Sequence, residues 1–535
     1  MSAPLLTVAE GSTYRRTSRH REVLEYLARL AERSDRVRVV SMGASGLGQD
    51  MPCVVLGPKG CDRPETARAS GLPIVLVVAN IHAGEVEGKE SCLALARDLS
   101  MGSLAPLCER AVVLLVPDYN PDGNDLIDPG HRALDLARLE GQIGPEGGVG
   151  TRYTGAGWNL NRDYTKQDAV ETRHLAALLA AWMPHVVVDC HTTDGSIHGY
   201  DLTYDTSRNL ASCPAGPAVW ARDRFLPEIS RGLRSRTGSR TWFYGNFRDA
   251  DDPASGWESY PPLARYGSHY RGLLGGVDVL LEAYSYIDFR ARCDVMAAIL
   301  VEILARSASE GAEIVRLVDA ARADVAARGR DPRPGDLVGI DYGTAVRDAG
   351  GRLSFRHPGA HTTDVDLDVW DLPSTRARTI PGRMREVARV PFLGRYDPTV
   401  SVARPFAYLV PRERTSVIEK LSTHRLRTLE SARESSVRTQ TYRVVAREPT
   451  ASPDVGTAVR TETVFTVEAR EVAVTVRPGD VIVPMDQPWA NLAVYLLEPH
   501  SDDGLARWGH FDDVAVGADF PVRRIPRPIV LPGAP

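Results

Sequence analysis

Apolar and polar residues follow two different patterns along this chain, and the change comes near residue 330. Before it, short unbroken apolar runs alternate with longer stretches in which apolar residues recur at helical spacing. Residues 74–79 contain no polar side chain, as expected for a strand covered on both faces, whereas Val23, Leu27 and Leu30 share one side of a predicted helix. Strands that alternate with helices predict an α/β fold with a mixed, mostly parallel β-sheet flanked by helices.

The pattern locates these elements along the first part of the chain. The expected strands are residues 37–42, 52–56, 74–79, 111–116, 185–190 and 276–283. The expected helices are residues 17–33, 88–99, 167–183 and 218–234, with one or two more between 295 and 326. Residues 240–268 are expected to form a loop. Residues 124–158 are Gly-rich and irregular, and a loop of that length in a compact domain is usually functional.

Beyond residue 330 the pattern of apolar and polar residues changes. Residues 461–476 alternate polar and apolar positions, and residues 481–484 form a short apolar run, so both are predicted to be strands of antiparallel β structure. One helix is expected near residues 416–421. At 535 residues the chain is too long for one ordinary core. We therefore expect a larger catalytic domain of residues 1–330 and a smaller, mainly β accessory region of residues 331–535.

Composition narrows the function. The charged fraction of 25% and hydrophobic fraction of 43% are those of a soluble globular protein. A net charge of -5 gives no electrostatic case for binding nucleic acid or an anionic membrane. Neither a signal-like leader nor a run of about 18 apolar residues is visible, so we expect a cytoplasmic protein. The seven cysteines form no CxxC pair, which favours free thiols over disulfides or a cysteine-based zinc site. The oligomeric state is left open.

Candidate metal ligands follow two of the expected strands. His82 and Glu85 come directly after residues 74–79, and His191 stands at the end of the strand predicted for 185–190. Open α/β sheets bind ligands at the carboxyl ends of their strands. Each residue alone is more simply explained as a helix cap or a buried histidine. Together they form the three-ligand His and carboxylate set that catalytic zinc usually takes, with a position left for water.

The sequence resembles the zinc carboxypeptidase superfamily, the carboxypeptidase A-like metallopeptidases, over roughly residues 5 to 330. The later stretches 408–411 and 491–512 are similar to the C-terminal extension of large bacterial members. The motifs that carry the resemblance are His82-Ala83-Gly84-Glu85, Asn120-Pro121-Asp122-Gly123, Asn161-Arg162-Asp163, Asp189-Cys190-His191-Thr192-Thr193-Asp194-Gly195 and Glu282-Ala283-Tyr284.

The resemblance implies a catalytic role for each matched residue. His82, Glu85 and His191 would bind one Zn²⁺ per chain. Glu282 would be the general base for a zinc-bound water. Arg152 would stabilise the oxyanion that forms during hydrolysis.

Substrate contacts are implied in the same way. Asn161 and Arg162 would hold the terminal carboxylate of the substrate, a task that suits a planar bidentate donor. A tyrosine before Glu282 closes over substrate in this family. Tyr260, Tyr266 and Tyr270 all compete for this role. Spacing alone favours Tyr260, but the Ser268-His269-Tyr270 context is more similar to bacterial members and ranks Tyr270 first. Arg265 would add a second carboxylate contact.

The implied function is a zinc-dependent metallocarboxypeptidase that hydrolyses the C-terminal peptide bond of peptides. Two departures from the family pattern keep alternatives open. Asn159 stands where an aspartate that orients a zinc-binding histidine is common, and Leu274-Gly275 stands where large bacterial members have an Arg-Asn pair. One alternative is an amidase or deacylase acting on N-acyl amino acids, cell-wall peptides or a biosynthetic intermediate. The other is a catalytically silent peptide-binding protein. The expected partner is a peptide or a small acylated amino acid.

Overall fold

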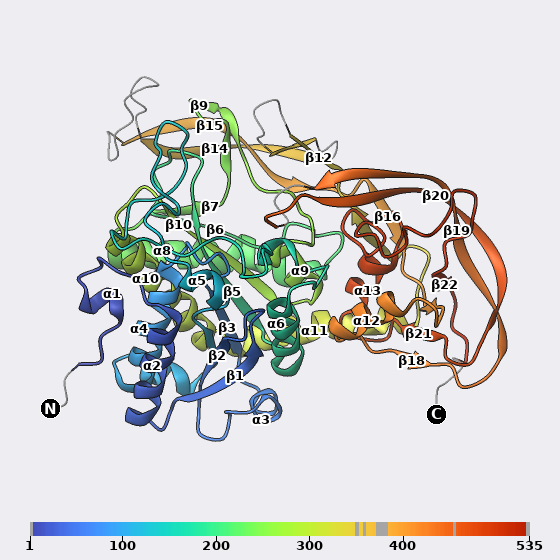
Figure 1. The fold of residues 1–535 in the computed structure, drawn as a ribbon, viewed down its shortest axis with the longest axis horizontal. Helices are drawn as coiled ribbons and strands as arrows, with labels where there is room; N and C mark the ends of the chain where they lie inside the picture. Colours follow the sequence, from blue (N-terminus) through green and yellow to red (C-terminus); the bar gives the residue numbers. More distant parts are fainter. Residues whose placement is uncertain (1–3, 348–352, 357–359, 371–383, 453–455, 531–535) are drawn as a thin grey trace.

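A central eight-stranded sheet dominates the first part of the chain, and the C-terminal third packs beside it (Figure 1). The computed structural model describes residues 4–347, 353–356, 360–370, 384–452 and 456–530. The central sheet has the order β1-β2-β4-β3-β5-β10-β6-β7. Its strands are β1 (Arg38–Ala44), β2 (Asp50–Leu56), β3 (Ile74–Ala79), β4 (Val112–Val116), β5 (Val186–Thr193), β6 (Leu202–Asp205), β7 (Thr241–Phe243) and β10 (Val277–Tyr284).

Strands β4, β3, β5 and β10 run parallel, so their carboxyl ends meet at one edge of the sheet. The register pairs Glu282 with His191 across β10 and β5, and Ala79 with Cys190 across β3 and β5. The predicted mixed, mostly parallel sheet is confirmed. This edge receives the residues that follow β3, β5 and β10.

Both faces of the sheet are covered, as the unbroken apolar runs predicted. Along β3, Val75 and Val77 pack into one apolar cluster while Leu76 and Val78 pack into the other, because successive side chains of a strand point to opposite faces. The first cluster includes residues from α2 (His20–Arg33), α4 (Glu87–Met101), α8 (Leu226–Thr237), α10 (Phe289–Ser309) and α11 (Gly311–Arg330). The second includes residues from α3 (Pro64–Ala69), α6 (Val170–Trp182), α9 (Gly267–Leu273), α12 (Thr415–Thr423) and α13 (Ala490–Leu497). The remaining helices are α1 (Val8–Gly11), η1 (Ala105–Glu109), α5 (Pro121–Asp125), η2 (Leu160–Arg162), α7 (Ala215–Trp220) and η3 (Ala221–Phe225).

The expectation of a loop over residues 240–268 is wrong. That stretch contains β7, β8 (Asn246–Asp249) and β9 (Asp252–Glu258). These strands are short and contain polar residues, Pro253 and Gly256, so their sequence lacks the periodicity of a strand. Their pairing is also non-local, because β9 lies beside β15 (Met384–Tyr396), with Trp257 opposite Phe392.

The C-terminal third is mainly β, as predicted. A six-stranded sheet has the order β18-β21-β17-β22-β19-β20. Its strands are β17 (Ala407–Val410), β18 (Leu429–Glu430), β19 (Ser435–Ser452), β20 (Arg460–Val476), β21 (Val481–Pro484) and β22 (Arg523–Ile525). The predicted strands at 461–476 and 481–484 and the helix near 416–421 correspond to β20, β21 and α12. The smaller pairs are β11 (Leu337–Asp341) with β16 (Val400–Ala403), β12 (Thr344–Arg347) with β13 (Leu353–Arg356), and β14 (Ala360–Trp370) with β15.

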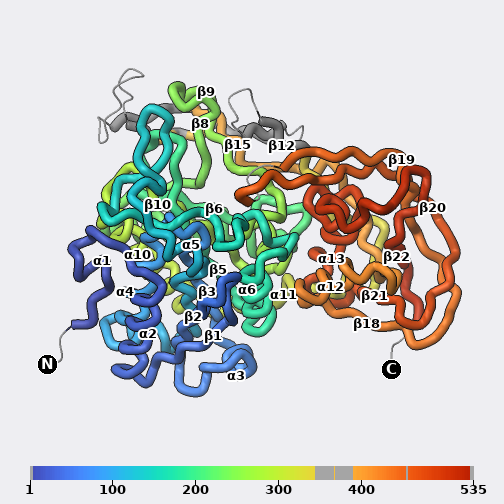
Figure 2. The backbone as a smooth tube through the Cα atoms, in the orientation of Figure 1, coloured from blue at the N-terminus to red at the C-terminus, as the bar shows by residue number. Residues whose placement is uncertain are grey.

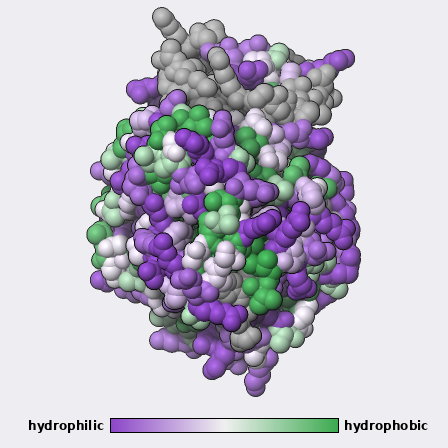
Figure 3. Space-filling model, turned by 90° about the vertical axis from the view of Figure 1, so that its right-hand side faces the viewer, coloured by the Kyte–Doolittle hydropathy of each residue, from purple (hydrophilic) through white to green (hydrophobic). Residues whose placement is uncertain are grey.

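The C-terminal region is not isolated from the sheet. In the tube view of Figure 2, strand β15 lies near the top of the molecule beside the green β8 and β9. The apolar cluster on the α6 face of the central sheet continues into Tyr408, Val410 and helix α13. The face shown in Figure 3 mixes hydrophilic groups with several separate apolar areas, which is ordinary for a surface in water.

All seven cysteines are free thiols, as predicted, and Cys61 alone among them is not fully buried. No helix in the part of the chain that the structure describes is long and apolar enough to cross a membrane. The cytoplasmic location and the domain boundary at residue 330 stay predictions, although α11 ends at Arg330.

Candidate metal centre

His82, Glu85 and His191 come together at the carboxyl edge of the sheet. Strand β3 ends at Ala79, and Asn80, with φ at 65°, turns the chain toward α4. His82 and Glu85 lie in the connection between β3 and α4, while His191 lies on the neighbouring strand β5. All three side chains are buried, with 4%, 3% and 2% of their surface exposed. The predicted trio is therefore one spatial cluster.

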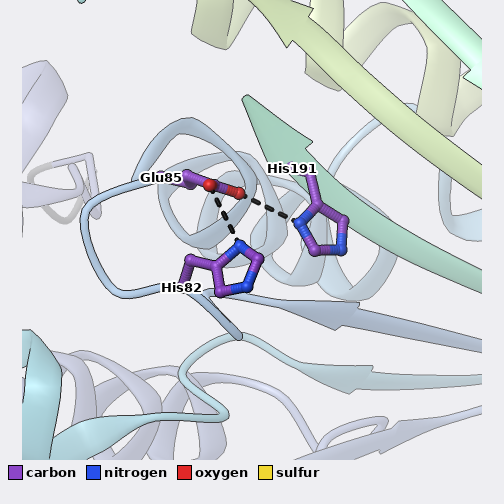
Figure 4. Close-up of side chains that lie close together, drawn as sticks. All are labelled: His82, Glu85 and His191. Carbon is purple, nitrogen blue, oxygen red and sulfur yellow. Dashed lines mark hydrogen bonds and ion pairs between the residues drawn. The ribbon is translucent and has the colours of Figure 1, made fainter. Parts of the chain in front are cut away.

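The carboxylate of Glu85 faces both imidazoles, with one oxygen directed at each ring (Figure 4). Nδ1 of His82 lies 3.0 Å from Oε1 of Glu85, and Nδ1 of His191 lies 3.0 Å from Oε2. One donor atom from each residue can be chosen so that all three lie within 4.8 Å of one another. Donor atoms this close can share one ion.

Asn159 fixes which nitrogen of His82 carries the proton. Its Oδ1 accepts the backbone N–H of Asn161 at 3.2 Å, which identifies that atom as the oxygen. Nε2 of His82, 3.1 Å from the same oxygen, must then donate to it. In the neutral ring, Nδ1 is left with a lone pair facing the Glu85 carboxylate. Two acceptors facing each other call for a cation beside them; the guanidinium of Arg152 lies there in this structure, and a metal ion is the other cation that both atoms can bind.

The charges of the cluster fit a divalent metal. Burial lowers the pKa of His82 to about 4, and the nearby Arg152 adds to this effect, so the ring is neutral. Burial opposes ionisation of Glu85, but His82 and His191 outweigh it and hold its pKa well below the ordinary value. Burial also opposes protonation of His191, but Asp189 outweighs it and raises the pKa, so this ring must lose a proton when a metal binds. Two imidazoles and a carboxylate are a donor set that zinc accepts.

Glu282 faces the same edge from β10. It is paired in register with His191 and is only half-buried. Burial raises its pKa to about 8; Glu85 and Asp194 act in the same direction, while His191 and Arg132 oppose them. A carboxyl group in this setting can exchange a proton near neutral pH.

Arg152 also reaches the cluster. Its Nη1 lies 3.1 Å from Nδ1 of His82 and 3.7 Å from Oε1 of Glu85, and a third of its side chain is exposed. A guanidinium group in this position can donate to an oxygen that develops negative charge beside the metal ligands.

Asn161 and Arg162 lie on η2, immediately after Asn159. The guanidinium of Arg162 lies 4.4 Å from the ring centroid of Tyr266. Oδ1 of Asn161 accepts the backbone N–H of Gly267 at 2.9 Å. Both side chains are partly exposed. The pair is thus tied to the metal cluster through Asn159.

The structure does not bring Tyr270 or Arg265 to the cluster. The hydroxyl of Tyr270 lies 2.8 Å from Nδ1 of His424, and its ring packs against Tyr164, with only 2% of the residue exposed. Arg265 is 7% exposed, and its guanidinium forms ion pairs with the side chains of Glu462 and Asp503. Both side chains are directed at residues beyond 330, so the proposed substrate site does not include them.

Tyr244 and Tyr266 lie closer than Tyr270 to the candidate site residues, so they are better placed to close over a substrate. Burial raises the pKa of Tyr244, and the next contributions come from Glu282 and Asp194. Tyr266 stacks on Arg162. Tyr244 follows the short strand β7, which the sequence pattern did not reveal. Sequence spacing alone therefore could not have selected it.

Arg132 is a site residue that the sequence analysis missed. Its Nη1 lies 3.3 Å from Oε1 of Glu85, and its Nη2 donates to the carbonyl of Thr192 at 3.2 Å and to Ser285 Oγ at 3.4 Å. It therefore links Glu85 to the ends of β5 and β10. A Cβ atom on Gly84 would lie 2.8 Å from Cδ of Arg132, so glycine allows this approach. Arg132 lies in the irregular stretch 124–158, where no sequence signal singles out one arginine.

Two buried imidazoles and a carboxylate at the carboxyl edge of a mixed α/β sheet, with a second carboxyl group and an arginine beside them, define a candidate zinc hydrolase. Comparison with known proteins makes the class specific. Residues 23–240 match the family model described as zinc carboxypeptidase.

Relatives and solved structures that this chain resembles are also named carboxypeptidases. Carboxypeptidase 2 of Trichophyton rubrum is 23% identical over 468 residues, which are 84% of this chain and 76% of that protein. Carboxypeptidase 2 of Trichophyton tonsurans is 27% identical over 147 residues, 25% of this chain and 23% of that protein. A metallo-carboxypeptidase structure from Burkholderia cenocepacia aligns with 54% of this chain and 68% of its own, at 16% identity and a TM-score of 0.38. These matches support the zinc carboxypeptidase superfamily for this chain and, with it, the enzyme class of the zinc metallocarboxypeptidases.

Proposed function

We propose that this chain removes the C-terminal residue of peptides that end in a free carboxylate, with one Zn²⁺ held by His82, Glu85 and His191. One contact gives the main support. Oδ1 of Asn159 accepts from both His82 and the backbone of Asn161. A carboxylate held by Asn161 and Arg162 therefore leaves the last peptide bond of the substrate close to the candidate ligands.

Each residue then has a defined task. When bound, zinc polarises the carbonyl group and lowers the pKa of water toward about 7. The Glu282 carboxylate takes a proton from the water whose oxygen bonds to the carbonyl carbon. It returns that proton to the amide nitrogen as the C–N bond breaks. The guanidinium of Arg152 donates to the oxygen that carries negative charge between these two events.

Arg162 and Asn161 account for the preference for a free carboxylate. A guanidinium group binds a carboxylate through two parallel hydrogen bonds, which an amide cannot match. The ring of Tyr266 supports the guanidinium plane from one side. The substrate class is thus a peptide or a small acylated amino acid with its terminal carboxylate free. We further propose that residues 1–330 form the catalytic domain and residues 331–535 an accessory region.

The proposal can be tested with metal analysis and one matched substrate pair. We expect stoichiometric zinc, and hydrolysis of an N-acyl dipeptide as the free acid but not as the C-terminal amide. Arg162→Met should raise the Michaelis constant for the acid about tenfold or more. Arg138→Met is the control, because Arg138 is 72% exposed in a different loop.

The other outcomes separate the alternatives. Equal hydrolysis of the acid and the amide would contradict exopeptidase action and favour an amidase. Tight peptide binding without turnover by the zinc-loaded protein would identify a silent binding protein.

A further inference from the structure

Two residues of the C-terminal region, Asp503 and Trp508, reach across to the loops that carry the carboxylate-binding pair. They lie in the segment that follows α13, the red coil beside the α13 label in Figure 1. Asp503 is fully buried. The indole N–H of Trp508 donates to Oδ1 of Asp503 at 2.9 Å, so the two side chains act as one unit.

Asp503 holds the loop that leads into α9. Its Oδ1 accepts from Nε of Arg265 at 3.0 Å, and its Oδ2 accepts the backbone N–H of the same residue. Glu462 on β20 takes the other end of the guanidinium, with Nη1 2.7 Å from Oε1. A buried arginine held at its side chain and its backbone fixes the conformation of its neighbours in the chain.

Tyr266 and Gly267, which follow Arg265, contact the proposed carboxylate-binding pair. Tyr266 places its ring 4.4 Å from the guanidinium of Arg162. The backbone N–H of Gly267 donates to Oδ1 of Asn161 at 2.9 Å. A Cβ atom on Gly267 would lie 2.4 Å from Nη1 of Arg271, so glycine allows the Arg271 guanidinium to lie against the backbone here. Asn161 and Arg162 therefore each have a partner on the loop that Asp503 holds.

Trp508 contacts both loops. Its ring lies 4.6 Å from the Arg265 guanidinium and 4.7 Å from Nζ of Lys166. Nζ of Lys166 in turn donates to the backbone carbonyl of Arg162. A cation over an aromatic face gains about 0.5–2 kcal/mol, more when water is excluded. The Asp503–Trp508 unit thus holds the loop of residues 161–166 and the loop of residues 265–267 against each other.

We propose that Asp503 and Trp508 are positioning residues for substrate carboxylate recognition, acting through Arg265, Tyr266 and Lys166 on Asn161 and Arg162. The inference rests on the proposed function, because it assigns the C-terminal region a part in the same site. The accessory region then sets the affinity for substrate while leaving the metal cluster, which it does not contact through these residues, unchanged.

Variants of the two residues test this directly. In Asp503→Asn and Trp508→Leu we expect the Michaelis constant for a free-acid N-acyl dipeptide to rise about tenfold or more, with kcat within about threefold of wild type. The inhibition constant of the free amino-acid product should rise in parallel. Zinc affinity, measured by chelator competition, should not change. Trp508→Phe keeps a ring between the two cations and should recover most of the loss.

A matched control separates positioning from general destabilisation. Glu498 is as deeply buried in the C-terminal region as Asp503, but it binds Tyr408 and Tyr442, far along the chain from the two loops. Glu498→Gln should lower stability and leave both constants at wild-type values. If Glu498→Gln and Asp503→Asn raise them equally, or if neither Asp503→Asn nor Trp508→Leu raises them, the inference is wrong.

Hydrogen exchange supplies a readout that does not depend on catalysis. Backbone amides of residues 161–167 should exchange faster in Trp508→Leu than in wild type, and unchanged exchange would overturn the inference. If the wild-type protein neither hydrolyses free-acid peptides nor binds the product, the proposed function fails instead. The exchange result then still decides whether the C-terminal region holds these loops.

Discussion

Nε2 of His82 lies 3.1 Å from Oδ1 of Asn159, the position at which the family commonly has an aspartate. The amide oxygen accepts the imidazole proton but carries no full charge, so it makes His82 a weaker electron donor than a carboxylate would. The same oxygen accepts the backbone N–H of Asn161. One side chain thus connects a candidate zinc ligand with the candidate carboxylate site.

Replacing Asn159 should therefore change zinc affinity in both directions. Asn159→Asp should bind zinc up to about tenfold more tightly, and Asn159→Leu about 10–100-fold more weakly. Competition with a coloured chelator at fixed pH measures both. Wild-type zinc affinity in the leucine variant would show that this contact does not orient His82.

Glu282 should be needed for turnover but not for metal binding. Its carboxyl group is not among the three donors that lie within reach of one ion. Glu282→Gln keeps the shape of the side chain and removes its ability to accept a proton. We expect kcat to fall by about 10²–10⁴-fold, with zinc content unchanged by metal analysis. Full activity in this variant would remove Glu282 from the proposed mechanism.

The parts of this protein that were predictable from sequence depend on local patterns. Strand β3 is a continuous apolar run, so its bounds were predicted to the residue at 74–79. His82, Glu85 and His191 directly follow or end such strands, and the topology of parallel strands brings them to one edge. Local pattern and fold class were sufficient for the metal cluster.

The parts that were missed depend on contacts between distant residues. Strand β9 contains proline and glycine, and it is completed by β15 more than a hundred residues later. The sequence context of Tyr270 ranks it above Tyr260 and Tyr266, but in the structure its hydroxyl on α9 lies against His424. Arg132 reaches Glu85 from a loop without periodicity. In each case the residue is positioned by a contact with a distant part of the chain, which the local sequence pattern does not reveal.

Arg132 should matter most when the metal is absent. It lies 3.3 Å from the buried Glu85 carboxylate, and removing it leaves that charge to His191 and Arg152 alone while the hydrogen bonds to Thr192 and Ser285 are also lost. Arg132→Leu should lower the free energy of unfolding of the zinc-free protein by about 3 kcal/mol. Zinc should recover part of this loss, because the ion neutralises the same carboxylate.

Urea denaturation with EDTA and with saturating zinc measures both effects. Arg138→Leu is the control, since Arg138 belongs to the same loop but is 72% exposed and pairs only with surface carboxylates. The Arg138→Leu substitution should lower the free energy of unfolding by less than about 1 kcal/mol. Equal losses with and without zinc in Arg132→Leu would mean that its contact with Glu85 is unimportant.

Stability should fall as the pH drops below 6.5, because several histidines are buried as neutral rings. Burial lowers the pKa to about 3 in each of four residues outside the metal cluster: His185, His198, His269 and His424. In His185, Nδ1 already accepts the backbone N–H of Ile74 at 3.0 Å, so a proton there would break a hydrogen bond.

The direction follows from proton uptake. Below pH 6.5 the unfolded chain protonates these rings, whereas the folded chain does not until about pH 3, so protons favour unfolding throughout that window. At pH values well below 6.5, each such histidine lowers the free energy of unfolding by about 1.4 kcal/mol per pH unit. The urea midpoint should therefore decrease steadily from pH 6.5 to 5. His185→Asn keeps an acceptor for Ile74 and should reduce the proton uptake on unfolding by about one; a midpoint that does not change with pH over this range would contradict the prediction.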